Sequence, residues 1–200
     1  MTLQEISTDM PTPRVLMLIV LIFAAASARL LPHLHNLAPM TAVALFAAAY
    51  FPSRRWSVLL PLVAMFLSDV VLYATKDVAY RDQALSNMIF VYPAFAVVAG
   101  LGQWLRGRVT VGRAIVTALG CSVVFFLITN FGAWLTLSRM TPPFYSQTFG
   151  GLIDCYIAGV PFLRGTIAGD LLYTAALFGG IAWLERRVPQ SSQTLVQPTR

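Results

Sequence analysis

The stretch that decides the fold is Ala24–Phe51, AAASARLLPHLHNLAPMTAVALFAAAYF. Two Ala-rich apolar runs flank a short polar segment that contains Arg29, His33, Asn36 and two prolines. Each apolar run is long enough, or nearly long enough, to cross a bilayer as a helix, so we expect the polar segment to be a short loop at one membrane face. We predict that this loop covers a binding site at that face.

The composition indicates a membrane protein before any motif is considered. Hydrophobic residues make up 58% of the 200 residues and charged residues 11%, whereas a soluble domain has about 25% charged residues. The mean hydropathy is +0.71. A chain of this composition cannot surround an apolar core with a polar shell. The expected fold class is therefore an all-α membrane protein.

Apolar runs separated by polar, Pro-rich or Gly-rich breaks predict six transmembrane helices, at about 15–31, 37–51, 57–75, 85–105 and 113–137, with the last from 162 or 166 to 184. The piece Gly151–Ala158 is too short to span, and we expect a short outer-face helix or re-entrant element there, before the last span. The predicted organisation is a polar N-terminal segment (1–13), a six-helix domain (14–187) and a disordered cytoplasmic tail (188–200).

The first apolar run allows two interpretations. The small residues Ala24, Ala26 and Ala28 could follow the hydrophobic region of a cleavable signal peptide. In an uncleaved span, Ala24 and Ala28 would instead form a small-residue face suited to close helix packing. We favour the uncleaved span, because its removal would leave an odd number of helices and disturb the charge pattern described next.

The Lys and Arg residues are distributed unequally between alternate loops. With the N-terminus inside, nine of the 14 lie on the inner side and five on the outer side. The positive-inside rule therefore predicts a multi-pass protein of the bacterial inner membrane with both termini in the cytoplasm. The net charge of +6 then reflects topology and not nucleic-acid binding, for which no basic helix or aromatic platform is present.

Polar residues within the spans gather, on this topology, in the outer half of the bundle, while the inner half is almost purely apolar. Spacings of three or four residues place an acid or amide on the same helix face as an aromatic ring. This pattern predicts a pocket for a small ring-bearing or amphipathic solute. The predicted substrate-binding residues are Arg29, His33, Asn36, Asp69, Tyr73, Asn130, Trp134, Arg164, Asp170 and Tyr173.

Each of these residues also has a structural interpretation. The acids and arginines could form ion pairs that only fix helix register, and Arg29 and Arg164 could reach lipid headgroups. Asn130 could hydrogen-bond a neighbouring helix, and Tyr73 and Trp134 could belong to the interfacial aromatic belt. These interpretations do not explain why matching polar groups are missing at the inner end.

An enzyme is not expected. Ser68 precedes Asp69 without a histidine partner or a nucleophile-elbow motif, and no phosphate-binding loop is present. The two cysteines, Cys121 and Cys155, form neither a disulfide framework nor a metal site. His33 and His35 have no carboxylate or thiol at metal-ligand spacing. We therefore expect no cofactor and no metal.

Four pieces of the sequence carry a resemblance to a known family: RLLPHLHNLAPMTAVALF (29–46), FLSD (66–69), LITNFGAWL (127–135) and GLIDCYIAGVPFLRGTIAGDLLYTAALFG (151–179). They resemble an uncharacterised family of small bacterial membrane proteins assigned to transport. That family in turn is similar to the substrate-binding S components of energy-coupling factor (ECF) transporters. Those proteins have six helices, bind vitamins or metal ions near the outer face, and dock on a transmembrane scaffold with two ATPases.

The resemblance implies a transport component that captures a small solute and relies on scaffold and ATPase subunits for energy. It implies that Ala24 and Ala28 contact the scaffold, although they lie toward the middle or outer half of the span. The alternative is a structural or assembly protein whose buried polar residues only hold helices together. A self-sufficient carrier would need a polar path through the inner half or an internal repeat, and neither is evident.

Overall fold

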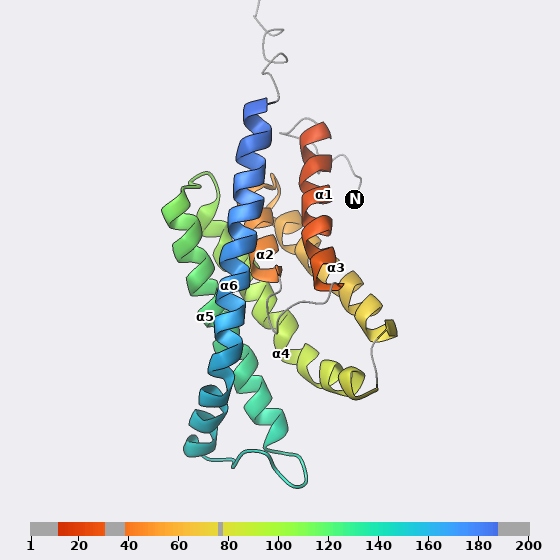
Figure 1. The fold of residues 1–200 in the computed structure, drawn as a ribbon, viewed down its shortest axis with the longest axis vertical. Helices are drawn as coiled ribbons and strands as arrows, with labels where there is room; N and C mark the ends of the chain where they lie inside the picture. Colours follow the sequence, from red (N-terminus) through yellow and green to blue (C-terminus); the bar gives the residue numbers. More distant parts are fainter. Residues whose placement is uncertain (1–11, 31–38, 76–77, 188–200) are drawn as a thin grey trace, which may run out of the picture.

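The computed structural model describes residues 12–30, 39–75 and 78–187. All regular secondary structure in these parts is helical, without a strand (Figure 1). The elements are α1 (Thr12–Ser27), the 3₁₀ turn η2 (Ala28–Leu30), α2 (Met40–Tyr50), α3 (Arg54–Thr75), α4 (Val78–Gly102), the 3₁₀ turn η3 (Gln103–Leu105), α5 (Val111–Leu137) and α6 (Phe149–Arg187). The predicted all-α class is confirmed.

The number of full-length spans is smaller in the structure than the six predicted. Among the described residues, four helices, α3 to α6, are long and apolar enough to cross a membrane, whereas α1 and α2 are shorter apolar helices. The 11 residues of α2 rise only about 16 Å, against the roughly 30 Å of a bilayer's hydrocarbon core. Six full-length spans are therefore not confirmed.

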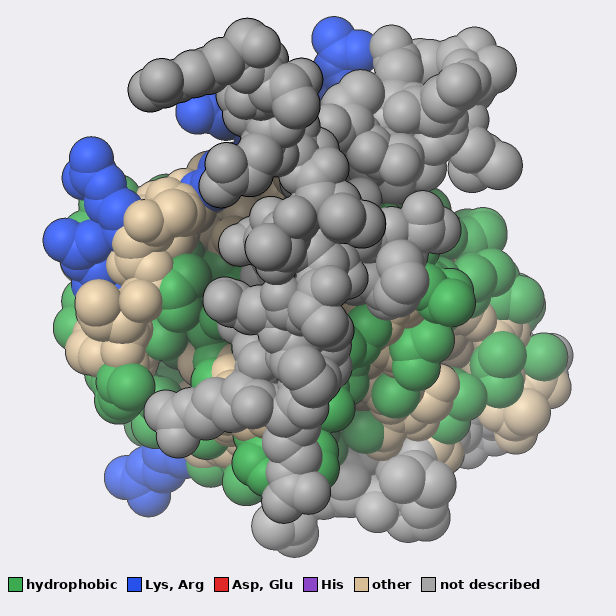
Figure 2. Space-filling view, turned by 90° about the horizontal axis from the view of Figure 1, so that it is seen from above, with side chains coloured by type: hydrophobic (Ala, Val, Ile, Leu, Met, Phe, Trp, Pro, Cys, Tyr) green, Lys and Arg blue, Asp and Glu red, His purple; other side chains and the backbone are tan. Residues whose placement is uncertain are grey.

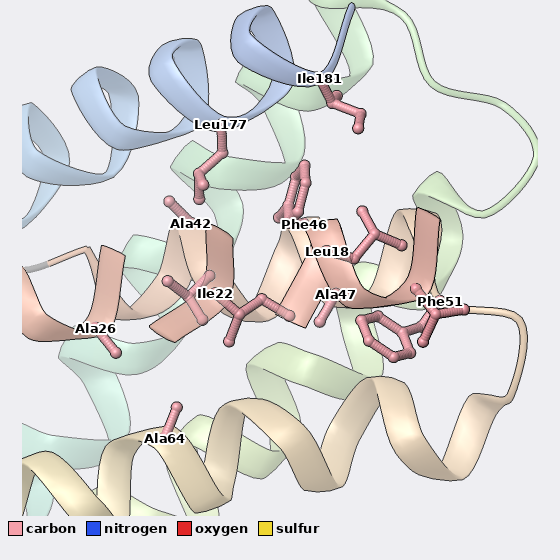
Figure 3. Packing of buried hydrophobic residues seen from close by; sticks show 12 residues of the cluster. Leu18, Ile22, Ala26, Ala42, Phe46, Ala47, Phe51, Ala64, Leu177 and Ile181 are labelled. Carbon is pink, nitrogen blue, oxygen red and sulfur yellow. The ribbon is translucent and has the colours of Figure 1, made fainter. Parts of the chain in front are cut away.

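Helix α2 is the centre of the bundle. Its residues from Thr41 to Ala48 are all buried, and it contacts α1, α3, α4, α5 and α6. Figure 3 shows Phe46 of α2 between Leu18 and Ile22 of α1 and Leu177 and Ile181 of α6. Because α2 is surrounded by other helices, its apolar residues pack against protein and not lipid.

Helix α6 is one continuous helix where the sequence predicts two separate elements. The expected short element at Gly151–Ala158 and the last span form a single helix of 39 residues, about 58 Å long. Pro161 lies inside it and removes one backbone hydrogen bond, but the helix continues because α5 packs along it on both sides of the proline. The prediction of a separate element was wrong.

Consecutive helices run in opposite directions along the long axis, so α1 begins and α6 ends at the same end of the molecule (Figures 1 and 3). The outward face of α3 is apolar, with exposed fractions of 45% for Val63 and 56% for Phe66. Leu59, Leu67, Val70 and Val71 extend this face. A continuous apolar surface of this kind is suited to lipid contact.

Candidate functional site

The first polar cluster joins three helices through Asp69. The Arg29 Nη2 lies 2.8 Å from Asp69 Oδ1, and the Tyr92 hydroxyl donates to Asp69 Oδ2 at 2.9 Å. Arg29 Nη1 also donates to Ser68 Oγ at 2.7 Å. The two charged side chains are 18% and 12% exposed. Both carboxylate oxygens are thus occupied, and the end of the first helix is tied to α3 and α4.

The second polar cluster surrounds Asp170 on α6. This side chain is only 1% exposed, and its Oδ2 accepts a hydrogen bond of 2.6 Å from Ser122 Oγ on α5. The carboxylate also interacts with the Thr41 hydroxyl and the Ala42 N–H in the first turn of α2. Pro39, at the N-cap of α2, makes no capping side-chain bond. Asp170 therefore supplies hydrogen-bond acceptors where the N-terminus of α2 is buried.

A pocket of about 380 Å³ lies between α4, α5 and α6. Most of its lining residues are apolar or aromatic: Val91 from α4, Phe125, Ala133 and Leu137 from α5, and Ala158, Gly159 and Phe162 from α6. Polar groups come from Thr129, Asn130, Tyr145 and Cys155. No Lys, Arg, Asp or Glu is among these lining residues, so the pocket is suited to a neutral ligand.

Asn130 is the predicted site residue that lines this pocket. Its Nδ2 donates to the Phe126 carbonyl at 3.0 Å, which leaves Oδ1 directed toward α6. A Cβ atom at Gly159 would overlap that Oδ1, so glycine is required for the close approach of the two helices. The Cys155 thiol donates to the Asn130 carbonyl at 3.6 Å. The amide is therefore held at the α5–α6 contact by short-range packing.

The loop between α5 and α6 closes one side of the pocket through Tyr145. Trp134 Nε1 donates to the Ser146 carbonyl at 3.0 Å, and Gln147 Nε2 donates to the Ser138 carbonyl at 3.3 Å. Burial, with smaller effects from Cys155 and Asp154, raises the pKa of Tyr145 above its ordinary value. A phenol is protonated at neutral pH even at its ordinary pKa, so this hydroxyl is a hydrogen-bond donor, and it interacts with the Cys155 thiol.

The structure separates several of the predicted site residues from this pocket. Arg29 and Asp69 lie in the first cluster and Asp170 in the second, whereas Trp134 anchors the loop. The others do not line the pocket: Tyr73 is 39% exposed on α3, Arg164 is exposed on α6, and Tyr173 packs against the hydrophobic core. His33 and Asn36 lie outside the described residues.

The predicted partner-docking alanines lie on the first helix and turn, where Ala24 is exposed and Ala28 half-buried. Sequence reasoning did not select Ser122, Tyr145 or the apolar pocket walls as site residues. A serine inside an apolar helix gives no signal by itself, and Phe125 or Phe162 cannot be told from a core residue by pattern. Within the described residues, no group of three His, Cys, Asp or Glu side chains could hold a metal ion.

The apolar helices and the outward apolar faces are consistent with a helical membrane protein, and a pocket lies between three of these helices. The chain belongs to a family of unknown function, DUF6580, which matches residues 10–191. Comparison with curated proteins and with solved structures gives no match.

Proposed function

We propose that this protein captures a small, neutral, largely apolar solute in the pocket between α4, α5 and α6, as the substrate-binding component of a membrane transport system. The observation that supports this proposal is the pocket itself. Its volume of about 380 Å³ is within the common range for small-molecule sites, and its aromatic walls suit a ring-bearing molecule. The Asn130 amide and the Tyr145 hydroxyl would supply directional hydrogen bonds.

The charge distribution supports an orientation with the pocket in the outer half of the bundle. The starts of α3 and α5 and the turn after η3 carry Arg54, Arg55, Arg106, Arg108 and Arg113. Figure 2 shows Lys and Arg side chains on the rim of this end of the molecule. By the positive-inside rule this end, where α1 begins and α6 ends, faces the cytoplasm of a bacterial inner membrane.

Transport would require partner subunits, because the sequence offers no nucleotide-binding motif to supply energy. A transmembrane scaffold and ATPases of the ECF type are the partners that the resemblance to S components implies. Residues Ala24 and Ala28 would contact that scaffold through their small side chains.

A structural or assembly function is the second candidate, and the Arg29–Asp69 cluster favours it. The contacts of that cluster use both carboxylate oxygens of Asp69 and two guanidinium nitrogens of Arg29. Such a network holds helices in register without needing a ligand. This function predicts an empty pocket and a stable protein partner.

The test is mass spectrometry of small molecules released from gently purified protein. Ala133 lines the pocket, and Ala133→Phe would fill part of it. Ala176→Phe is the matched control, because Ala176 is exposed elsewhere on α6. We expect a compound that is present in wild type and in the control and depleted in Ala133→Phe. Equal amounts in all three, or a folded protein without any bound compound, would contradict the proposed function.

A further inference from the structure

The carboxyl group of Asp170 is buried, and the protein leaves one of its two oxygens without a hydrogen bond. Its Oδ2 is bound by Ser122, but its Oδ1 is buried without a hydrogen-bond partner. The contacts with Thr41 and Ala42 in α2 therefore lie short of a full hydrogen bond to Oδ1. An acidic side chain in a membrane bundle is costly and commonly marks an ion pathway. The open lone pairs of Oδ1 are available for a further group.

Another unpartnered oxygen lies beside Asp170 on the same helix. Thr174 Oγ1 is buried without a hydrogen-bond partner. Thr174 lies one turn beyond Asp170 on α6, on the same face. With Ser122 of α5 bound to Asp170, the α5–α6 seam holds a carboxylate and two hydroxyl oxygens.

The charge of Asp170 is not balanced by a basic side chain in the part of the chain that the structure describes. The ion pair there joins Arg29 to Asp69, and Arg164 on α6 is exposed. The titratable group that interacts with Asp170 from α5 is the Cys121 thiol, which carries no positive charge. From α2 come Thr41 and the backbone N–H of Ala42. A buried carboxylate without a counter-charge is strongly disfavoured.

We propose that Asp170, with Ser122 and Thr174, forms a binding site for a monovalent cation, either a proton on Oδ1 or a sodium ion held by the carboxylate and hydroxyl oxygens. Either cation, the proton or the sodium ion, would neutralise the one buried negative charge of Asp170. A calcium ion would require six to eight oxygen ligands, usually including several carboxylates. A transition metal would require imidazole or thiolate ligands, which the described residues do not gather in a group.

This cation site is distinct from the solute pocket. Along α5, Ser122 is eight residues from Asn130, and along α6, Asp170 is eleven residues from Gly159. These separations correspond to about 12 and 16 Å. Both sites lie on the same α5–α6 seam, so a cation that changes this seam could alter the pocket. The cation site does not depend on the proposed function, and its test needs no solute.

The experiment measures thermal unfolding of the purified full-length protein in detergent under two conditions. In the first, sodium chloride replaces choline chloride at constant ionic strength and pH. In the second, the pH is varied without sodium. A ligand that binds the folded state raises its unfolding temperature, so a sodium site predicts stabilisation by sodium. A proton site predicts greater stability at lower pH, because the folded state then binds the proton more tightly than the unfolded chain.

Asp170→Asn should lose the response that wild type shows, since the amide cannot bind either cation in this way. Asp154→Asn is the matched control, because Asp154 lies on the same helix and is exposed, and it should retain the response. Identical responses in wild type and in Asp170→Asn, under both conditions, would overturn the proposal.

If Asp170→Asn fails to fold, Thr174→Val keeps the side-chain shape and removes one oxygen. For a sodium site, it should raise the sodium concentration at half-maximal stabilisation by about tenfold. For a proton site, the infrared band of a protonated carboxyl group should be present in wild type and shift in Ser122→Ala, which removes the hydrogen bond to Oδ2. A wild type with neither sodium stabilisation nor a protonated buried carboxyl would overturn the proposal.

Discussion

Arg29 and Asp69 form an ion pair between the first helical segment and α3, with Nη2 and Oδ1 2.8 Å apart. Tyr92 of α4 binds the other carboxylate oxygen. Because both charged side chains are mostly buried, water can replace neither partner completely. The pair and the Tyr92 hydroxyl therefore join three helical segments through one carboxylate.

Removing one partner of this pair should destabilise the fold. Arg29→Met leaves Asp69 with one hydrogen bond and a largely buried charge, and should cost about 2 kcal/mol of unfolding free energy. The double variant Arg29→Met/Asp69→Leu should recover part of this loss, because no lone charge remains. Unfolding by SDS in mixed micelles measures both effects. Arg139→Met, at an exposed loop position, is the control, and strictly additive costs would show that the pair is not coupled.

A second prediction concerns the contact between α4 and α5. A Cβ atom at Gly132 would overlap the ring of Phe90, so Gly132→Ala should destabilise the bundle by about 1–3 kcal/mol through overpacking. Gly120→Ala meets open space on the same helix and should be neutral or slightly stabilising. The thermal unfolding midpoints of wild type and of the two variants measure these differences in stability. Phe90→Ala should rescue Gly132→Ala, and a failure of this rescue would place the cost elsewhere.

The longest helices could be predicted from the sequence with good boundaries. The expected spans 57–75 and 113–137 correspond to α3 and α5, which begin only a few residues earlier. The surroundings of α2 could not be predicted, since hydropathy does not distinguish an apolar helix in lipid from one inside a protein. In α6, the glycines and Pro161 predicted a break, but packing against α5 overrides this local preference.

The candidate site was only partly accessible to sequence reasoning. Asp69, Asn130 and Asp170 stand out because they are polar residues inside apolar runs. Their partners depend on which helices meet, and Tyr92 and Ser122 are distant from them in sequence. We expected one outer pocket lined by all of these polar residues, but the fold separates them. The pocket contains Asn130, whereas Asp69 and Asp170 form hydrogen bonds with side chains of other helices.

A third prediction concerns the loop that closes the pocket. Trp134→Phe keeps the aromatic ring but loses the hydrogen bond to the Ser146 carbonyl, which should cost about 1 kcal/mol and loosen the loop around Tyr145. Trypsin should then cleave faster at the exposed Arg139. Trp104→Phe, at the opposite end of the bundle, is the control. Equal cleavage rates in wild type and Trp134→Phe would mean that this bond does not hold the loop.

The last prediction concerns orientation in the membrane. Val109 and Phe144 are exposed positions at opposite ends of the bundle. The arginines cluster at the end of the bundle where Val109 lies. If that end faces the cytoplasm, a membrane-impermeant maleimide should label Phe144→Cys in intact cells and Val109→Cys only after the membrane is opened. Wild type is the blank, because both native cysteines are buried. The reverse pattern would place the pocket in the inner half and would rule out capture of a solute from outside.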